Sequence, residues 1–302
     1  MKAQYKLASS FLLAALLTGC GGGGGTSATL ASFSSWNAVQ RPSAFTVEGI
    51  SQSGNYTWNS STDRITSRVD GTSQSGAAYT GTYDANGYAT AVTLTPAGGS
   101  SVSWSRTSGD TFGYLILNSN IDAAVSADGS KIGLAANPYD YNWDYQTFGI
   151  WTTGAGTGSG TYGAMSIGAQ TAGSAIPTTG TATYSGYTGG RYVNAAGQYW
   201  FTSSAMTAAA NFGTRSIAFT TTGTQVTPDL INVANNTNLN MSGNLTYAAA
   251  TNQITGTVTT TGGLSGSVNG RFYGPSAQEI GGTFSVTGAG LEGYAGAFGG
   301  KR

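Results

Sequence analysis

The sequence predicts an all-β protein with two folded domains, and three observations support this fold class. Past residue 44, Thr, Tyr, Val, Phe and Trp alternate with polar or small residues, which is the period of half-buried strands. Gly, Asn, Asp or Pro interrupts this alternation often enough to mark short turns. The chain has 48 Gly among 302 residues, an excess that suits turns and strongly curved strands. The one stretch that also fits a helix is Ser204 to Phe212.

The composition excludes several classes of function. The chain contains no His, which removes Ser-His-Asp and Cys-His catalysis and the common zinc sites. No pair of carboxylates has the spacing of a catalytic motif, and we expect the protein not to be an enzyme. Charged residues make up 8% of the chain and the formal net charge is zero, so no nucleic-acid partner is expected. Acidic residues prevail over 45–175 and basic ones over 176–302, which suggests two lobes.

The first 20 residues have the layout of a bacterial lipoprotein leader. Two Lys precede an apolar run over 7–17, which is too short to span a bilayer. The letters LTGC that end at Cys20 resemble a lipobox, and Cys20 is the only Cys in the chain. We therefore expect a signal peptide over 1–19 and a Cys20 that carries acyl chains such as palmitate. Gly21, in place of Asp, is typical of a lipoprotein of the outer membrane.

The composition after the leader predicts a tether and then two domains. Residues 20–44 begin with a run of Gly and continue with small residues, as flexible linkers do. A random coil of this length has a reach of roughly 25 to 30 Å. We expect a first β domain over 45–171 and a second over 172–302, both held away from the membrane surface.

The second domain is expected to be an eight-stranded up-and-down barrel. Short loops join eight consecutive strand-like runs, and eight antiparallel strands can close without leaving an edge. The runs cover 180–193, 198–212, 214–226, 238–247, 252–262, 264–274, 277–287 and 291–299. Leu264, Val268 and Phe272 share one face. Because the period does not say which face is inside, a barrel with its apolar face toward lipid remains an alternative.

The first domain is expected to be a smaller antiparallel sheet. Its strand-like runs are 53–59, 64–69, 78–84, 89–95, 101–106, 111–119 and 145–153.

Three segments of the second domain carry a family resemblance. They read AIPTTGTATYSGYTGG at 175–190, GRFYGPSAQEIGGTFSVTG at 270–288 and LEGYAGAFGGKR at 291–302. In this order they resemble the β-barrel domain of the transferrin-binding protein B family of surface lipoproteins. In the first domain, TFGIWTTG at 147–154 resembles the family's handle domain less closely.

The resemblance implies a handle sheet beside an eight-stranded barrel, attached to the outer membrane by its lipid and exposed at the cell surface. Relatives capture host transferrin, haem proteins or complement regulators, so we expect a protein ligand of unknown identity. This chain has one handle and barrel pair where the transferrin receptors have two. Two alternatives remain: a structural envelope lipoprotein without a soluble ligand, and a haem carrier. Without His, haem would need Tyr or Met as its axial ligand.

The segment NPYDYNWDY at 137–145 is the candidate partner-binding loop. Tyr139, Tyr141, Trp143 and Tyr145 alternate with short polar residues, a combination typical of contact loops. The same pattern also fits a strand of the first sheet that turns one aromatic face to the core. An Asp-x-Asn-x-Asp run inside it lacks the Gly and the Glu of a calcium loop, so no metal site is expected.

The turn before the strand at 277–287 is expected to be structural. Gly274-Pro275-Ser276 is predicted to be a three-residue tight turn, since Pro fixes φ and Gly allows unusual dihedral angles. Such a loop would place Arg271 opposite Glu279 across the hairpin. We predict an ion pair between them worth about 0.2 to 1 kcal/mol.

Overall fold

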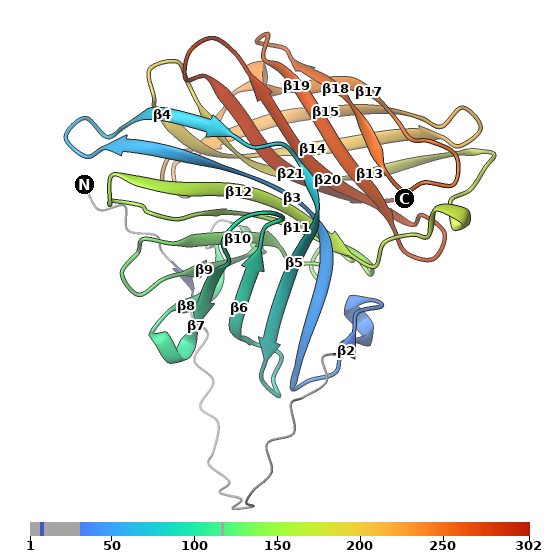
Figure 1. Cartoon of the computed structure of the whole chain (residues 1–302), viewed down its shortest axis with the longest axis horizontal. Coiled ribbons are helices and arrows are strands. Elements are labelled where there is room, and N and C mark those ends of the chain that lie inside the picture. Colours follow the sequence, from blue (N-terminus) through green and yellow to red (C-terminus); the bar gives the residue numbers. More distant parts are fainter. Residues whose placement is uncertain (1–6, 9–30, 116–117) are drawn as a thin grey trace, which may run out of the picture.

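The computed structural model describes residues 7–8, 31–115 and 118–302. The predicted lipidation site Cys20, most of the leader and the first part of the tether therefore lie outside the described residues. Two β domains follow each other along the chain (Figure 1), which confirms the all-β fold class. In the described part of the chain, no helix is long and apolar enough to cross a membrane.

Nine antiparallel strands form the main path of the first sheet. They are β3 (Ser43–Asn59), β5 (Gln74–Tyr83), β6 (Ala89–Thr95), β7 (Val102–Ser105), β8 (Thr111–Leu115), β9 (Asn118–Val125), β10 (Ile132–Ala136), β11 (Gln146–Thr152) and β12 (Ser159–Gly168). Their order is β8-β9-β10-β11-β12-β3-β5-β6-β7. The two ends of this path, β7 and β8, follow each other in the chain, so the sheet curls until it is nearly closed (Figure 1).

Short elements complete the first domain. They are β1 (Leu7–Ala8), which pairs with β8, β2 (Ala31–Ser32), which runs parallel to β3, β4 (Arg64–Asp70), which pairs with β3, and the 3-10 turns η1 (Trp36–Ala38) and η2 (Arg106–Ser108). The domain is larger than the small sheet expected from the sequence. The first half of β3, most of β9 and all of β10 and β12 lie outside the predicted runs.

The segment predicted as a tether ends earlier than residue 44. Trp36 is buried in the core of the first sheet with Phe45 and Val47, and Phe33 and Val39 pack against the same core. The indole N–H of Trp36 donates a hydrogen bond of 3.0 Å to a main-chain carbonyl of β11. Small-residue composition predicts flexibility, but these apolar side chains bury enough surface to hold 33–39 on the sheet.

The second domain is a closed eight-stranded antiparallel barrel, as the sequence predicts. Its strands are β13 (Thr181–Val193), β14 (Tyr199–Asn211), β15 (Ser216–Thr227), β17 (Met241–Thr246), β18 (Ile254–Thr260), β19 (Ser265–Tyr273), β20 (Glu279–Thr287) and β21 (Gly293–Lys301). Each pairs with the next, and β21 pairs with β13 to close the ring. The loops carry η3 (Gly173–Ala175), β16 (Ala234–Asn235) and η4 (Thr237–Leu239).

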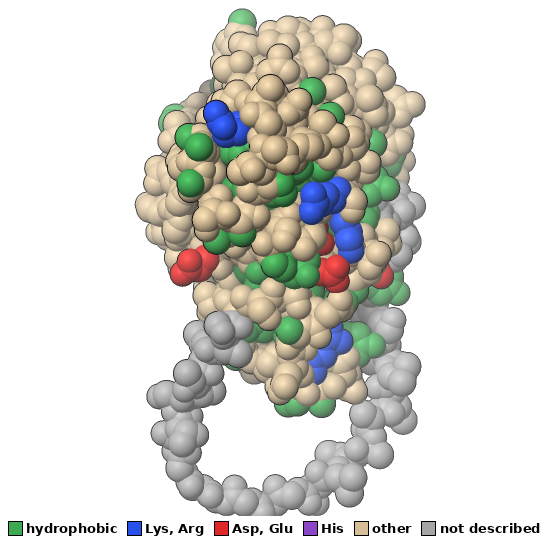
Figure 2. Space-filling model, turned by 90° about the vertical axis from the view of Figure 1, so that its right-hand side faces the viewer, with side chains coloured by type: hydrophobic (Ala, Val, Ile, Leu, Met, Phe, Trp, Pro, Cys, Tyr) green, Lys and Arg blue, Asp and Glu red, His purple; other side chains and the backbone are tan. Residues whose placement is uncertain are grey.

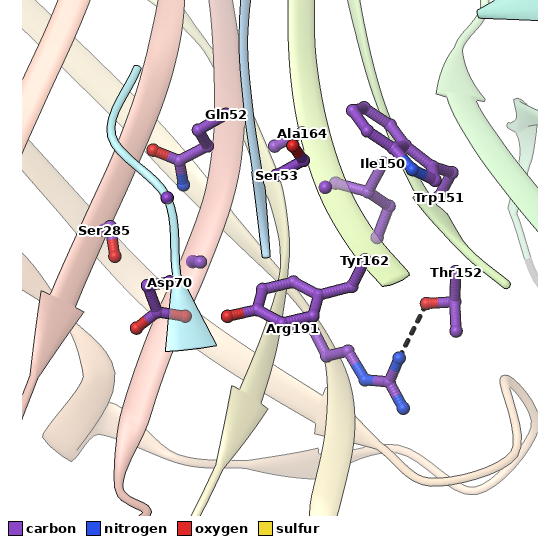
Figure 3. Close-up of a pocket in the computed structure, with 13 residues that line it drawn as sticks. Gln52, Ser53, Asp70, Ile150, Trp151, Thr152, Tyr162, Ala164, Arg191 and Ser285 are labelled. Carbon is purple, nitrogen blue, oxygen red and sulfur yellow. Dashed lines mark hydrogen bonds between the residues drawn. The ribbon is translucent and has the colours of Figure 1, made fainter. Parts of the chain in front are cut away.

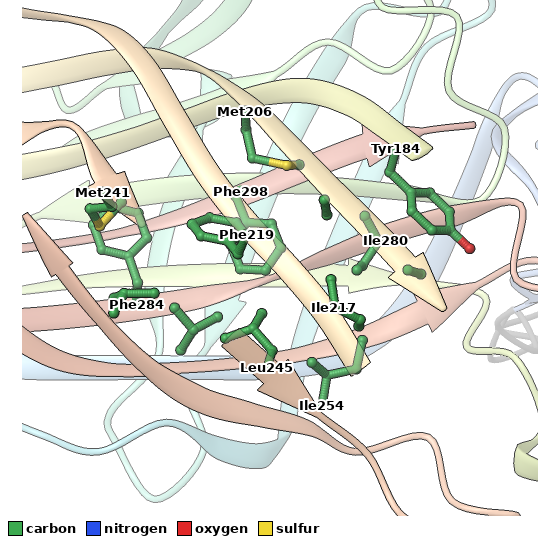
Figure 4. Close-up of a cluster of buried hydrophobic side chains, with 14 of the residues drawn as sticks. Tyr184, Met206, Ile217, Phe219, Met241, Leu245, Ile254, Ile280, Phe284 and Phe298 are labelled. Carbon is green, nitrogen blue, oxygen red and sulfur yellow. The ribbon is translucent and has the colours of Figure 1, made fainter. Parts of the chain in front are cut away.

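The barrel interior is filled by apolar side chains (Figure 4). Phe219 and Phe298 meet edge to face at 5.0 Å between ring centroids. Val268 and Phe272 are fully buried, so the predicted apolar face points inward. This orientation overturns the alternative in which that face points to lipid. The exposed positions of β17 and β18 carry Ser, Asn and Thr.

The two domains meet where β11 and β12 pack against β20 and β21, a contact that we call the joint (Figure 1). Glycines allow the two sheets to come this close. A Cβ atom at Gly281 would lie 2.6 Å from Oγ of Ser166, and one at Gly299 would lie 2.4 Å from Nε2 of Gln146. Because ordinary side chains do not fit here, the joint is a tight, extended contact and not a loose linker.

Candidate functional site

The candidate binding segment, 137–145, is a turn and not a strand. It connects β10 to β11 at the side of the joint. Oδ1 of Asn137 accepts hydrogen bonds from the main-chain N–H groups of Tyr139 at 3.0 Å and Asp140 at 3.4 Å, which starts the turn. Asn142 has a φ of 54° and reverses the chain direction a second time. The alternation of aromatic and polar residues therefore does not put the aromatic side chains on one face.

The four aromatic side chains of the segment have different surroundings. Trp143 is only 3% exposed and packs on Phe148 of β11, with 5.8 Å between ring centroids. Tyr145 is half-buried. Tyr139 is 44% exposed and Tyr141 is partly exposed. The structure thus keeps Tyr139 and Tyr141 at the surface and turns Trp143 into the core.

A residue of the barrel completes the exposed aromatic group. Tyr187 of β13 is 46% exposed, and its ring lies 4.9 Å from the ring of Tyr141. Tyr141 in turn stacks on Trp143 at 4.8 Å. We call Tyr141 and Tyr187, together with the exposed Tyr139 two residues earlier in the segment, the joint patch. Sequence reasoning missed Tyr187, although in the period of β13 it falls on the opposite face from the buried Tyr184 and could have been predicted to face outward.

The N-terminal segment supports one end of the patch. The hydroxyl of Tyr139 donates a hydrogen bond of 2.9 Å to the main-chain oxygen of Trp36. The guanidinium carbon of Arg41 lies 5.0 Å from the centre of the Tyr139 ring, within the range of a cation–π interaction. The patch is therefore built from three stretches of chain that are far apart in the sequence.

Two ionisable residues of the barrel hold the segment from the other side. The carboxylate of Glu279, the first residue of β20, accepts hydrogen bonds from three consecutive main-chain N–H groups, those of residues 144–146, at 2.7, 2.9 and 2.9 Å. Lys301 of β21 forms an ion pair of 2.9 Å with Asp144 and donates a hydrogen bond of 2.7 Å to the main-chain oxygen of Asn142. Burial raises the pKa of Glu279, and the three N–H groups and Lys301 act in the opposite direction.

The predicted ion pair between Arg271 and Glu279 is wrong. The connection between β19 and β20 has five residues, 274–278, so the residue opposite Glu279 is Tyr273, and Arg271 lies opposite Gly281. Arg271 instead donates a hydrogen bond of 2.7 Å to Oγ of Ser75 in the first domain.

The glycine of that turn behaves as predicted. Gly274 has a φ of 86°, in the left-handed region that favours glycine, and Pro275 follows it. A Cβ atom at Gly274 would lie 2.6 Å from the ring of Tyr145, so this turn also contacts the candidate segment.

A second polar group lies inside the joint (Figure 3). Arg191 of β13 is buried, donates a hydrogen bond of 2.7 Å to Oγ1 of Thr152, and faces the rings of Tyr56, Tyr199 and Phe201 at 5.2, 4.5 and 6.0 Å. It lines a cavity of about 10 Å³, the space of one water molecule. The contacts of Arg191 hold the two domains together at the joint. The cavity beside it is too small for an organic ligand.

The same cavity is lined by Asp70 of β4, which forms an ion pair with Arg68. Burial raises the pKa of Asp70, and Arg68 acts in the opposite direction. In Figure 3 the hydroxyl of Tyr162 points toward the Asp70 carboxylate. Among the described residues, no three Asp or Glu side chains come together as a metal site.

On the face shown in Figure 2, most of the surface is uncharged, and hydrophobic side chains form separate patches. Besides the joint patch, the large exposed apolar side chains of the described residues are Val69, Tyr88, Ile231 and Val233. The barrel interior is filled, so the outer surface of the described residues is where another molecule could make contact.

The family comparison identifies the barrel. Residues 176–302 match the family described as C-lobe and N-lobe beta barrels of Tf-binding protein B. The C-terminal domain is therefore a barrel of the transferrin-binding protein B type, as the three segments quoted above predict. The match does not include the first sheet. No curated protein matches the sequence.

Solved structures are similar over most of the chain at low sequence identity. A single-substitution mutant of transferrin binding protein B from Haemophilus parasuis is 13% identical with a TM-score of 0.43, over 87% of this chain and 76% of that one. The isotype 1 protein from Neisseria meningitidis is 14% identical with a TM-score of 0.41, over 86% and 77%. The haemoglobin receptor HpuA from Kingella denitrificans is 16% identical with a TM-score of 0.43, over 91% and 94%.

Proposed function

We propose that this chain is a lipid-anchored surface protein of the outer membrane that captures a protein partner with the joint patch. The observation that carries the proposal is the patch itself. Tyr139 and Tyr187 expose over two fifths of their surface, although they come from different domains, and Tyr141 lies between the two domains. Tyr side chains bury a large area at a small cost in conformational entropy, which makes them frequent anchors of protein interfaces.

The low charge of the chain favours the same kind of contact. Charged residues make up 8% of the sequence, so electrostatic steering is weak and aromatic contacts would supply most of the affinity. The barrel is of a family named for transferrin binding, and one similar structure is a haemoglobin receptor. These names support a host iron-carrier protein as the partner, with transferrin and haemoglobin as the first two probes.

The test uses intact cells that produce the full-length chain. Fluorescent transferrin and fluorescent haemoglobin are added separately, and cell-bound fluorescence is measured before and after the cells are treated with external protease. Saturable binding that protease removes supports the proposal. A chain that resists protease on intact cells, and binds neither probe, would instead be the structural envelope lipoprotein that the sequence leaves open.

A further inference from the structure

Glu279 stands at the point where the barrel touches the candidate segment. It is fully buried and begins β20, between Tyr273 of β19 and Lys301 of β21. Its Oε1 accepts the N–H of Asp144, and its Oε2 accepts the N–H groups of the next two residues, Tyr145 and Gln146. One side chain of the second domain thus satisfies three consecutive main-chain donors of the first.

These three donors lie at the point where the segment enters β11. Main-chain N–H groups that leave water need a hydrogen-bond partner, and in a sheet a neighbouring strand supplies it. Here the carboxylate of Glu279 accepts these hydrogen bonds in place of a neighbouring strand. Hydrogen bonds to a charged acceptor are stronger than those between neutral groups. The main-chain path of 144–146 therefore depends on a side chain more than 130 positions away.

Two ring contacts connect the residues fixed by Glu279 to the surface. Trp143 precedes the three fixed residues, is buried, and stacks on Tyr141 at 4.8 Å. Tyr141 lies 4.9 Å from Tyr187. A change in the main chain at Asp144 would move Trp143 out of its pocket and shift Tyr141 with it.

We propose that Glu279 is the positioning residue of the joint patch, because its carboxylate fixes the main chain of residues 144–146 and thereby the placement of Tyr141 beside Tyr187. The consequence for partner capture rests on the function proposed above. The charged groups that face Glu279 are Lys301 from β21 and Asp144 from the segment, and these two are paired with each other. Lys301 therefore holds the same segment through Asp144 and Asn142, but as a donor it cannot accept the three main-chain N–H groups that Glu279 accepts.

The first experiment needs no partner. It measures amide hydrogen exchange along the full chain for the wild type, Glu279→Gln and the control Glu292→Gln, which changes another barrel Glu that is hydrogen-bonded to Tyr192. Gln has one acceptor oxygen. If that oxygen takes the Oε2 position, the amide NH₂ faces the N–H of Asp144, donor against donor.

We expect exchange at 144–146 to accelerate about tenfold or more in Glu279→Gln, which corresponds to the loss of about one hydrogen bond. Exchange in the remaining barrel strands should stay near the wild-type rate, and Glu292→Gln should leave 144–146 protected. Glu279→Asp keeps the charge and both oxygens and should restore part of the protection. Unchanged protection of 144–146 in Glu279→Gln would overturn the proposal, and so would acceleration spread evenly over both domains, or loss of folding in both Glu279 variants.

The binding readout separates this inference from the proposed function. If wild-type cells bind one of the two probes, Glu279→Gln should weaken that binding about tenfold while the amount of protein on the cells is unchanged. Equal affinity of Glu279→Gln and wild type would overturn the positioning role in partner capture. If the wild type binds neither probe, the capture of these two carriers is contradicted, and the exchange result alone decides whether Glu279 fixes the segment.

Discussion

Gly299 of β21 lies directly against the side chain of Gln146 of β11. A Cβ atom at Gly299 would be 2.4 Å from Nε2 and 2.8 Å from Cδ of that side chain, which is itself fully buried. The two sheets are therefore in contact through a glycine on one side and an amide on the other. The close packing of the joint depends on this approach.

Replacement of Gly299 by Ala should loosen the joint. The added methyl group has no free space, because Gln146 is enclosed by both sheets. We expect the free energy of unfolding to fall by about 1–3 kcal/mol, as overpacking usually causes. Urea denaturation of the two variants Gly299→Ala and Gly213→Ala checks this. Gly213 is exposed and its nearest neighbour would be 3.3 Å from a Cβ atom, so its replacement should cost less than about 0.5 kcal/mol.

Arg191 should contribute strongly to the stability of the joint. Its guanidinium faces three aromatic rings from both domains, and its stem is buried. Arg191→Ala removes these contacts and the hydrogen bond to Thr152, so we expect a loss of about 2–4 kcal/mol in thermal or urea unfolding. Arg191→Lys keeps the charge but lacks the planar guanidinium group, so its stability should lie between those of the wild type and Arg191→Ala. A loss no larger than that of Arg302→Ala, which changes an exposed Arg, would contradict this account.

Glu279 should give the stability a dependence on pH. Because burial raises the pKa of its carboxyl group in the folded state, the folded protein holds this proton more tightly than the unfolded chain does. The contribution of Glu279 to stability is therefore highest below the ordinary pKa of Glu. It falls as the pH rises from that value through the higher folded-state pKa.

The difference in unfolding free energy between the wild type and Glu279→Gln isolates this contribution, since Gln does not titrate. The wild type should lose stability relative to Glu279→Gln as the pH rises from about 4 to 7. If the difference is constant over this range, or if the wild type gains stability relative to Glu279→Gln, the predicted rise of the folded-state pKa of Glu279 is wrong.

The predicted anchor concerns a residue outside the described part of the chain. Cys20→Ala removes the only thiol of the sequence and with it the site of lipidation. We expect the variant protein to leave the membrane fraction and to appear in soluble fractions after cell fractionation. Recovery of Cys20→Ala in the membrane at the wild-type level would show that the chain is held there in another way.

The barrel strands could be predicted from the sequence because the pattern that marks each strand lies within the strand itself. Strands away from the joint, such as β14, β15, β17 and β18, alternate between a filled interior and solvent, and short loops join neighbours in sequence. Residues 264–268 show the alternation, with Leu264 and Val268 inside and Ser265 and Ser267 exposed.

The first sheet was harder to predict because parts of it are covered on both faces. Positions 162–168 of β12 are all buried, since one face looks into the curled sheet and the other lies against the barrel. No alternation remains in such a strand, and small residues such as Gly163 and Ala164 do not indicate one.

The site depended on contacts that no local pattern contains. The segment 137–145 has the alternation of a strand, but the turn at Asn137 and the hydrogen bonds from residues 144–146 to Glu279 decide its path. The predicted pairing of Arg271 with Glu279 assumed a loop of three residues, and five shift the register. Of the aromatic residues singled out from the composition, Tyr139 and Tyr141 are at the surface and Trp143 is buried.

The central claim is that the joint patch contacts the partner, and one binding measurement on cells tests it most directly. Cells that display the wild type, the double variant Tyr139→Ser and Tyr187→Ser, or Val69→Ser are titrated with fluorescent transferrin and haemoglobin. Val69 is 63% exposed and lies in β4 opposite Asn55 of β3, outside the patch. We predict that the double variant loses at least about 2 kcal/mol of binding free energy, roughly 30-fold in affinity, while Val69→Ser binds like the wild type. Wild-type affinity in the double variant, at equal surface amount, would contradict the claim.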